Sequence, residues 1–89
     1  MISKDVTIIN KLGLHARAAA KFVTLASRFE ANLNVSRNGR KVNGKSIMGI
    51  MMLAASKGTV ITIIAEGSDE QDAIDALVAL IENRFDEEE

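Results

Sequence analysis

The sequence predicts an α+β fold: an open-faced β-sandwich in which a four-stranded antiparallel sheet carries two long helices and one short helix on one face. Segments that alternate apolar and polar residues are interrupted by segments with apolar residues at helical spacing. Both long helical segments are apolar along one side only, so each has one face to bury against a sheet. The predicted order is strand, helix, strand, strand, short helix, strand, helix, with right-handed crossovers.

The first strand is predicted over residues 2–9, and its core-facing side chains are those of Ile2, Val6 and Ile8. The first helix is predicted from Ala16 to about Ser27. Its apolar residues recur at helical spacing and form a buried stripe made of Ala19, Phe22, Val23, Ala26 and Phe29.

A β-hairpin is predicted next. Residues 33–35 alternate as in a short strand, and Val42 begins the following one. Asn38 and Gly39 lie between them and indicate a tight turn, because both residue types tolerate positive φ. Residues 59–65 are the richest in β-branched side chains, so we expect a central strand there.

The last helix is predicted to begin with Ser68 or Asp69 as its cap, with Gln71 completing a capping box if Ser68 is the cap. Four carboxylates, residues 86–89, oppose the helix dipole at its C-terminus. We therefore expect fraying near Phe85 and a solvated acidic tail. The buried stripe of this helix is predicted to consist of Ile74, Leu77, Val78, Ile81 and Phe85.

The composition limits the classes of function. With 89 residues, the chain is expected to form a single domain, 1–89, too small for a deep substrate pocket. There is no Cys and only one His, so neither a disulfide framework nor a metal site is expected. The net charge of −1 and the three Phe as sole aromatics argue against binding to nucleic acid.

Two further expectations concern location. The N-terminus lacks the basic and apolar regions of a secretory signal, and no apolar run approaches bilayer length. We therefore expect a cytoplasmic protein without membrane insertion. Chemistry at its surface would require a partner to complete the site.

The only histidine, His15, lies between Gly13 and the start of the first helix. The first amides of a helix have no intrahelical acceptor, and the helix dipole adds positive charge there. A phosphoryl group on His15 would therefore meet the backbone N–H groups of Ala16 and Arg17, together with the Arg17 guanidinium. Taken alone, a lone surface histidine is more often incidental than functional.

A basic stripe runs along the predicted exposed face of the first helix. It begins beside His15 and consists of Arg17, Lys21, Thr24 and Arg28. A solvated helix face is the more frequent explanation of such a stripe. The functional alternative is a docking surface for an acidic partner.

The short helix after Ser46 is apolar all round, which so small a domain cannot bury completely. We expect Ile47, Ile50 and Met51 to point inward and Met48 and Met52 to face solvent. Core packing explains each residue taken singly, whereas the group indicates an outward apolar patch suited to several partners. Ser46 itself is predicted to be the N-cap, a position that also tolerates a phosphate.

Three segments in this order and spacing resemble the HPr family, the histidine-containing phosphocarrier proteins of the phosphoenolpyruvate-dependent sugar phosphotransferase system: 13–17, 44–49 and 57–59. The resemblance implies that enzyme I phosphorylates His15, which passes the group to a sugar-specific permease A domain, while Arg17 helps to hold the phosphate. It implies docking through residues Ile47, Met48, Met51 and Met52 and through the basic stripe.

The resemblance also implies a regulatory role for Ser46, with HPr kinase/phosphorylase and a transcriptional regulator as partners. It implies no cofactor, because magnesium and phosphoenolpyruvate belong to the donor enzyme. The protein would be a phosphoryl-transfer intermediate rather than a stand-alone enzyme.

Two alternatives remain open at this point. The phosphohistidine output could be regulatory, as in nitrogen-related relatives, or the chain could be a non-catalytic binding module switched by phosphorylation of Ser46. One departure from the family pattern is Ala18, where the family usually has proline. Alanine is an excellent helix former, so we expect the helix to persist and only the rigidity of the loop to change.

Overall fold

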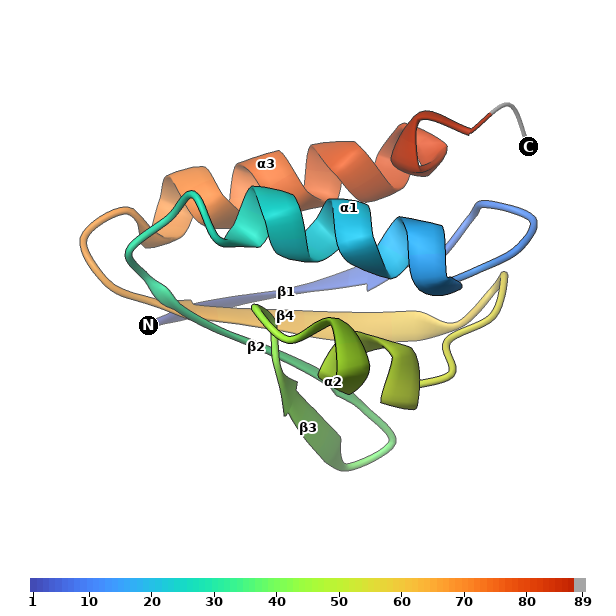
Figure 1. Ribbon diagram of the computed structural model, residues 1–89. Coiled ribbons are helices and arrows are strands. Elements are labelled where there is room, and N and C mark those ends of the chain that lie inside the picture. The colour runs from blue at the N-terminus through green and yellow to red at the C-terminus, as the bar shows by residue number, and fades with distance from the viewer. Residues whose placement is uncertain (88–89) are drawn as a thin grey trace.

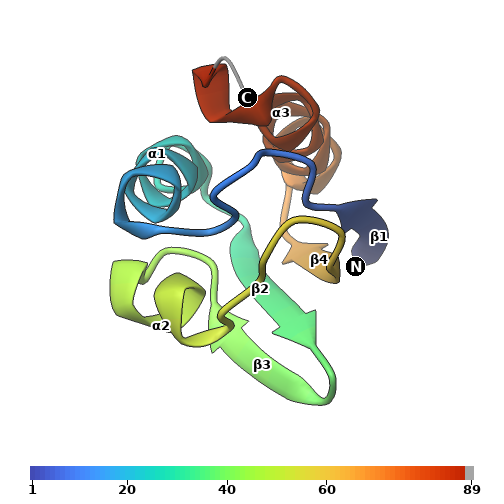
Figure 2. The ribbon, with the colours of Figure 1, turned by 90° about the vertical axis from the view of Figure 1, so that its right-hand side faces the viewer.

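A computed structural model describes residues 1–87 of the chain. Helices α1 and α3 lie side by side over one face of a sheet, and α2 lies on the same face beside α1 (Figures 1 and 2). The elements are β1 (Ile2–Thr7), α1 (Ala16–Ala26), β2 (Asn32–Arg37), β3 (Arg40–Asn43), α2 (Ile47–Met52), β4 (Val60–Glu66), α3 (Glu70–Glu82) and a 3₁₀ turn, η1 (Arg84–Asp86). The predicted fold class and element order are confirmed.

The four strands are antiparallel in the order β1-β4-β2-β3. Strand β4 pairs with both β1 and β2, which confirms the segment richest in β-branched residues as a central strand. The hairpin between β2 and β3 turns at Asn38 (φ 50°) and Gly39 (φ 81°), as predicted. The first strand ends at Thr7 rather than at residue 9, and β3 begins at Arg40, before Val42.

The core lies between the sheet and the helices. Strand β1 contributes Val6 to this core, and the loop after β1 contributes Ile8. Most residues of the two predicted helical stripes are also buried in it. Phe29 and Val78 are only partly buried at the edge of this core. The largest fully buried apolar side chains are those of Phe22, Phe85, Ile8, Ile50, Ile61, Ile63, Leu77, Ile81 and Val35. That the whole chain, 1–89, forms one domain stays a prediction.

The start of α3 differs from the predicted capping box. Asp69 is the N-cap residue, but its side chain makes no cap hydrogen bond. Its two carboxylate oxygens instead accept hydrogen bonds from the backbone N–H groups of Glu30 and Ala31, each 2.8 Å long. Gln71 donates to Asp75 at 2.8 Å, as a pair one helical turn apart. The carboxylate of Asp69 therefore ties α3 to the connection between α1 and β2.

Of the predicted solvated tail, Asp86 is exposed as expected, whereas the prediction is wrong for Glu87, whose side chain is only 15% exposed. Helix α3 ends at Glu82, and the chain then turns through three residues with left-handed φ values of 56°, 53° and 62°, at Arg84, Phe85 and Asp86. Burial of the Phe85 ring, which is fully removed from water, outweighs the unfavourable interaction of the acidic residues with the helix dipole. The tail residues 88–89 lie outside the described part of the chain.

Candidate functional site

The loop that carries His15 is held by close backbone contacts. Gly13 has φ +66°, and a Cβ at this position would lie 2.5 Å from the carbonyl oxygen of Ala55. That carbonyl accepts a 2.9 Å hydrogen bond from the N–H of Leu14, whose side chain is buried. Only glycine fits this close approach without moving the backbone. The loop therefore presents the next residue, His15, at a defined position.

His15 is the N-cap residue of α1. Its backbone is extended, with φ −70° and ψ 176°, and its carbonyl accepts a 2.8 Å hydrogen bond from the N–H of Ala19. Its side chain does not cap the helix and is 27% exposed. The first-turn amides of Ala16 and Arg17, which lack intrahelical acceptors, thus remain at the positive end of the helix dipole beside the imidazole.

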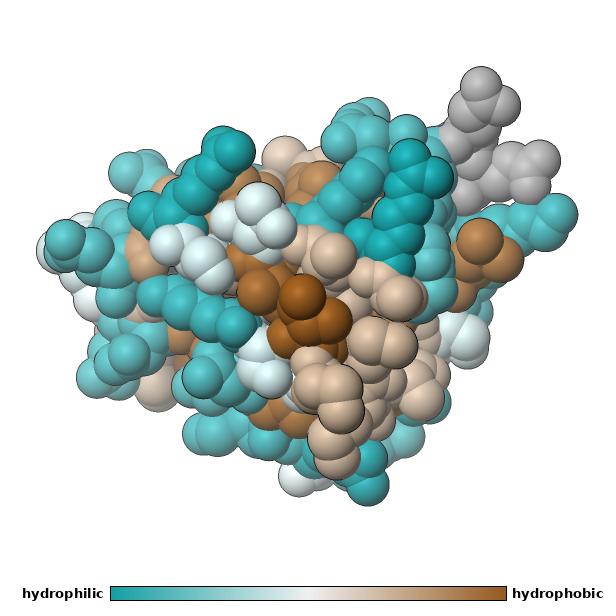
Figure 3. Space-filling model, viewed as in Figure 1, coloured by the Kyte–Doolittle hydropathy of each residue, from teal (hydrophilic) through white to brown (hydrophobic). Residues whose placement is uncertain are grey.

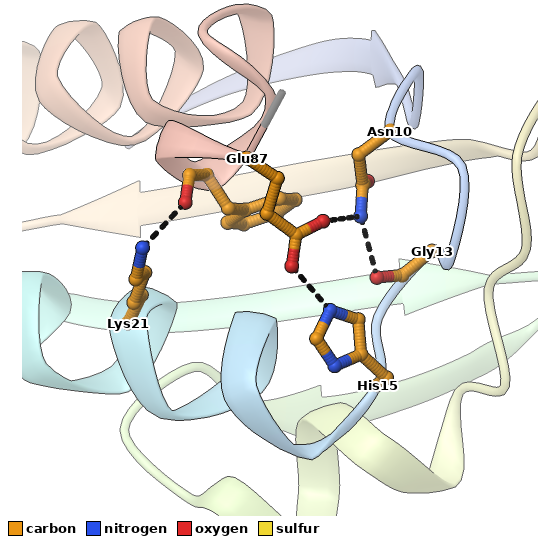
Figure 4. A network of polar contacts seen from close by, with 6 residues as sticks. Asn10, Gly13, His15, Lys21 and Glu87 are labelled. Carbon is orange, nitrogen blue, oxygen red and sulfur yellow. Dashed lines mark hydrogen bonds and ion pairs between the residues drawn. The ribbon is translucent and has the colours of Figure 1, made fainter. Parts of the chain in front are cut away.

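A carboxylate from the other end of the chain contacts the imidazole (Figure 4). Oε2 of Glu87 lies 2.6 Å from Nε2 of His15. Oε1 of Glu87 accepts a 3.0 Å hydrogen bond from Nδ2 of Asn10, which also donates to the carbonyl of Gly13 at 2.9 Å. Asn10 is fully buried, and the Glu87 side chain is only 15% exposed.

The surroundings of Glu87 favour its ionised form. Burial alone would raise its pKa, but hydrogen bonds from Asn10 and His15 and the positive charges of His15 and Arg17 outweigh burial and lower the pKa. Glu87 is therefore a carboxylate at neutral pH. Sequence analysis found neither Glu87 nor Asn10, because the contact joins residues 72 positions apart and no local pattern indicates it.

The basic stripe is only partly free in solvent. Arg17, Thr24 and Arg28 are exposed, as predicted. Lys21 is half-buried, and its ammonium donates a 2.7 Å hydrogen bond to the carbonyl of Phe85. The stripe lines a shallow depression between α1 and the end of α3, together with Ala20, Leu25, Leu80 and Asp86. Positive charge therefore borders the site along α1.

The short helix α2 begins as predicted at Ser46, whose Oγ accepts a 3.1 Å hydrogen bond from the N–H of Gly49. Within α2 only Ile50 is buried. Ile47 and Met51 were expected to point inward, but they are 43% and 41% exposed. A six-residue helix places few side chains on the face toward β3 and α1, and the rest must face outward.

The exposed residues of α2, Ile47, Met48, Met51 and Met52, form what we call the α2 patch. Figure 3 shows an apolar area on this side of the molecule, bordered by hydrophilic side chains. Because α2 packs against α1, the patch lies beside the helix that starts at His15 (Figure 2). The structure thus places the imidazole, the basic stripe and the α2 patch on neighbouring elements.

Among residues 1–87, no three His, Asp or Glu side chains gather where they could hold a metal ion. No helix within these residues has the length and apolar character needed to cross a membrane.

The fold and the site define a class of small open-faced α+β proteins in which a partly exposed histidine at a helix N-cap lies beside an exposed apolar helix. Comparison with known proteins makes the class specific. Residues 2–83 match the family model PTS-HPr, described as the PTS HPr component phosphorylation site. The chain belongs to this family of phosphocarrier proteins of the phosphotransferase system.

Known proteins are similar to this chain over its whole length. The chain is 60% identical to phosphocarrier protein HPr of Cupriavidus necator over 89 residues, which cover all of both chains. It is 58% identical over 90 residues to phosphocarrier protein HPr of Pseudomonas aeruginosa, again with both chains fully covered. The crystal structure of HPr-C-His from Thermoanaerobacter tengcongensis superposes with a TM-score of 0.96 at 53% identity and full coverage of both chains.

Proposed function

We propose that His15 accepts a phosphoryl group from enzyme I and passes it to a sugar-specific permease A domain. The observation that carries the proposal is the place of His15 at the N-terminus of α1, on a loop held by Gly13 and Leu14. The amides of Ala16 and Arg17 and the Arg17 guanidinium would surround a phosphoryl group there. With these partners, we expect the protein to act in the cytoplasm.

The chemistry is a nucleophilic displacement at phosphorus. A lone pair of the neutral imidazole forms the N–P bond while the bond to the donor breaks, and the donor keeps that electron pair. The phosphoramidate that forms then undergoes the same step with the acceptor. A single surface histidine supplies little transition-state stabilisation by itself, so donor and acceptor must provide most of the positioning and charge.

The surface that meets these partners is proposed to be the α2 patch with the basic stripe. Exposed Met side chains adapt to differently shaped partners, and the positive charges on Arg17 and Arg28 attract acidic surfaces. We expect Met48→Ala to weaken binding to enzyme I in calorimetry. Val60→Ala is the matched control, since Val60 is an exposed apolar side chain on the sheet, and it should leave the affinity unchanged.

Intact-mass analysis tests the central proposal. Incubation with enzyme I, magnesium and phosphoenolpyruvate should add one acid-labile phosphoryl group to the wild type and none to His15→Ala. If the wild type gains none while the same enzyme I phosphorylates another carrier, the proposal is wrong. The serine-switched binding module would then be the better explanation. If the wild type does gain the group, identifying its acceptor distinguishes a sugar permease domain from a regulatory or nitrogen-related one.

We further propose that HPr kinase/phosphorylase modifies Ser46 and so regulates the site, with a transcriptional regulator as a second partner. Ser46 directly precedes Ile47 and Met48, so a phosphate there would place a double negative charge beside the α2 patch. Ser46→Asp should slow phosphorylation of His15 by weakening the affinity for enzyme I. An unchanged affinity of this variant would refute that mechanism.

A further inference from the structure

We propose that Glu87 is a positioning residue for His15, holding its imidazole in the tautomer with the proton on Nε2 and a free lone pair on Nδ1. The proposal deepens the proposed function, on which it rests for the use made of that lone pair. It starts from the 2.6 Å contact between Glu87 Oε2 and His15 Nε2 (Figure 4).

The tautomer follows from the chemistry of the two groups. An ionised carboxylate can only accept hydrogen bonds, so a hydrogen bond to Nε2 requires the proton to be on Nε2. The neutral ring then has its acceptor lone pair on Nδ1. Burial raises the pKa of Glu87, but the hydrogen bonds from Asn10 and His15 and the positive charge of Arg17 act against burial, and the lowered pKa keeps this carboxylate ionised at neutral pH.

The carboxylate is itself held in place. Asn10, fully buried, donates from Nδ2 both to Glu87 Oε1 at 3.0 Å and to the carbonyl of Gly13 at 2.9 Å. The same amide therefore links the loop before His15 to the carboxylate that contacts the ring. On the other side, the buried Phe85 ring and the hydrogen bond from Lys21 to the Phe85 carbonyl anchor the turn that leads to Glu87.

The contact leaves the reacting edge of the ring open. In Figure 4 the second ring nitrogen lies on the edge turned away from Glu87. A phosphoryl group on Nδ1 would thus be separated from the carboxylate by the width of the ring. This arrangement lets Glu87 act on the imidazole without occupying the place of the phosphate.

Charge development during transfer also favours this role. As the Nδ1 lone pair forms the bond to phosphorus, the donor's bond breaks and the donor keeps its electron pair. The Nε2 proton stays on the ring, which becomes positively charged. A carboxylate already in contact with Nε2–H stabilises that charge, as an aspartate does for the imidazolium of a serine protease triad.

The tautomer can be measured without any phosphoryl transfer. Nitrogen-15 NMR of the imidazole at neutral pH should show predominantly the Nε2–H tautomer in the wild type. In Glu87→Ala the two tautomers should approach the mixture of a solvent-exposed histidine. Glu87→Gln keeps a carbonyl oxygen that can accept from Nε2 and should restore part of the preference. Glu82→Ala, at an exposed carboxylate near the end of α3, is the control and should match the wild type.

The rate gives the second readout. We expect Glu87→Ala to lower the single-turnover rate of His15 phosphorylation about 10- to 100-fold, by analogy with the loss of a group that orients a metal-binding histidine through its second nitrogen. The affinity for enzyme I should not change, because Glu87 acts on the ring rather than on docking.

Three results would overturn the proposal. They are an Nδ1–H tautomer in the wild type, an identical tautomer ratio in the wild type and Glu87→Ala, or faster phosphorylation of Glu87→Ala, which would make the contact inhibitory. Failure of the proposed function looks different: the wild type would then gain no phosphoryl group whatever the tautomer measurement shows.

Discussion

At the residue scale, one glycine and two polar side chains determine where the imidazole lies. Gly13 allows the loop to pass against the backbone of Ala55, and Asn10 and Glu87 fix the ring from the other side. None of these residues carries the proposed chemistry. Their effect is to reduce the number of orientations that His15 can adopt before a partner arrives.

Gly13→Ala should therefore be more damaging than an equivalent change elsewhere. Any L-residue at the positive φ of Gly13 costs about 1–2 kcal/mol of stability. The added Cβ would also clash with the carbonyl oxygen of Ala55. Gly39→Ala is the matched control: Gly39 also has positive φ, but nothing lies within 4 Å of a Cβ there. Urea unfolding should show a larger decrease in the free energy of unfolding for Gly13→Ala than for Gly39→Ala. Equal losses would contradict the importance of the close approach.

The candidate site was only partly predictable from the sequence. Glycine, helix-start and cap signals are local, and they led to the prediction of His15, Arg17 and Ser46 as site residues. Glu87 was not predicted, since it reaches His15 through three successive residues with left-handed φ, Arg84 to Asp86, and Arg and Phe rarely adopt that conformation. Asn10 could not be predicted either, because an asparagine in a loop sequence gives no indication that its side chain is buried.

At the element scale, α2 shows how a short helix persists without strong propensity. Ser46 accepts a hydrogen bond at its N-terminus. At its C-terminus, Arg37 donates to the carbonyl of Leu53 at 2.8 Å and Arg40 donates to that of Met52 at 3.1 Å. Side chains from the hairpin thus satisfy the terminal carbonyls of a helix that packs against it.

Most helices and strands could be predicted from the sequence, because periodicity and turn chemistry act over a few residues. The exposure of Ile47 and Met51 could not, because it depends on where β3 and α1 lie relative to α2. Asp69 is the N-cap residue of α3, one of the two predicted, but its lack of a side-chain cap hydrogen bond has a related reason. The Asp69 side chain finds two backbone donors from a distant segment, so it does not cap its own helix.

Asp69 should make the stability depend on pH. The hydrogen bond from the backbone N–H of Glu30 has the largest effect on the pKa of Asp69 and lowers it. Burial raises this pKa, but the hydrogen bond from Ala31 and other favourable contacts add to that from Glu30, and the pKa remains lowered. A carboxyl with a lowered folded pKa stabilises the fold above its unfolded pKa, and that stabilisation disappears as the pH falls through the folded pKa. Asp69→Asn should therefore lower the Tm at pH 7, with the difference shrinking below about pH 4, near the ordinary Asp value.

Circular dichroism melts at several pH values test this. Asp72→Asn is the control, since Asp72 is an exposed carboxylate in the first turn of the same helix. A Tm difference for Asp69→Asn that persists unchanged at acid pH would contradict the assignment.

At the scale of the whole molecule, the chain returns on itself so that residues near both ends build one site. Phe85, fully buried against the core, is the anchor of this return. Helices α1 and α3 lie side by side over the sheet (Figure 1); α1 carries the basic stripe, and α3 leads into the terminal turn.

Phe85→Ala should lower the free energy of unfolding by about 3–5 kcal/mol, the usual cost of truncating a buried phenylalanine. Phe29→Ala removes the same side chain from a partly buried position and should cost less. The His15 tautomer should also randomise in Phe85→Ala but not in Phe29→Ala. A tautomer preference that survives loss of the Phe85 ring would show that the terminal turn needs no anchor.

The strand order has a consequence for how the protein is made. Strand β1 pairs only with β4, which is the last strand along the chain. During synthesis, Ile2–Thr7 therefore emerges long before its partner Val60–Glu66, and no other strand of the described sheet is hydrogen-bonded to it. A nascent chain halted before residue 60 would hold the β2–β3 hairpin and α2 but an unpaired N-terminal segment. Pairing of β1 in the sheet is thus expected only after residues 60–66 have been synthesised.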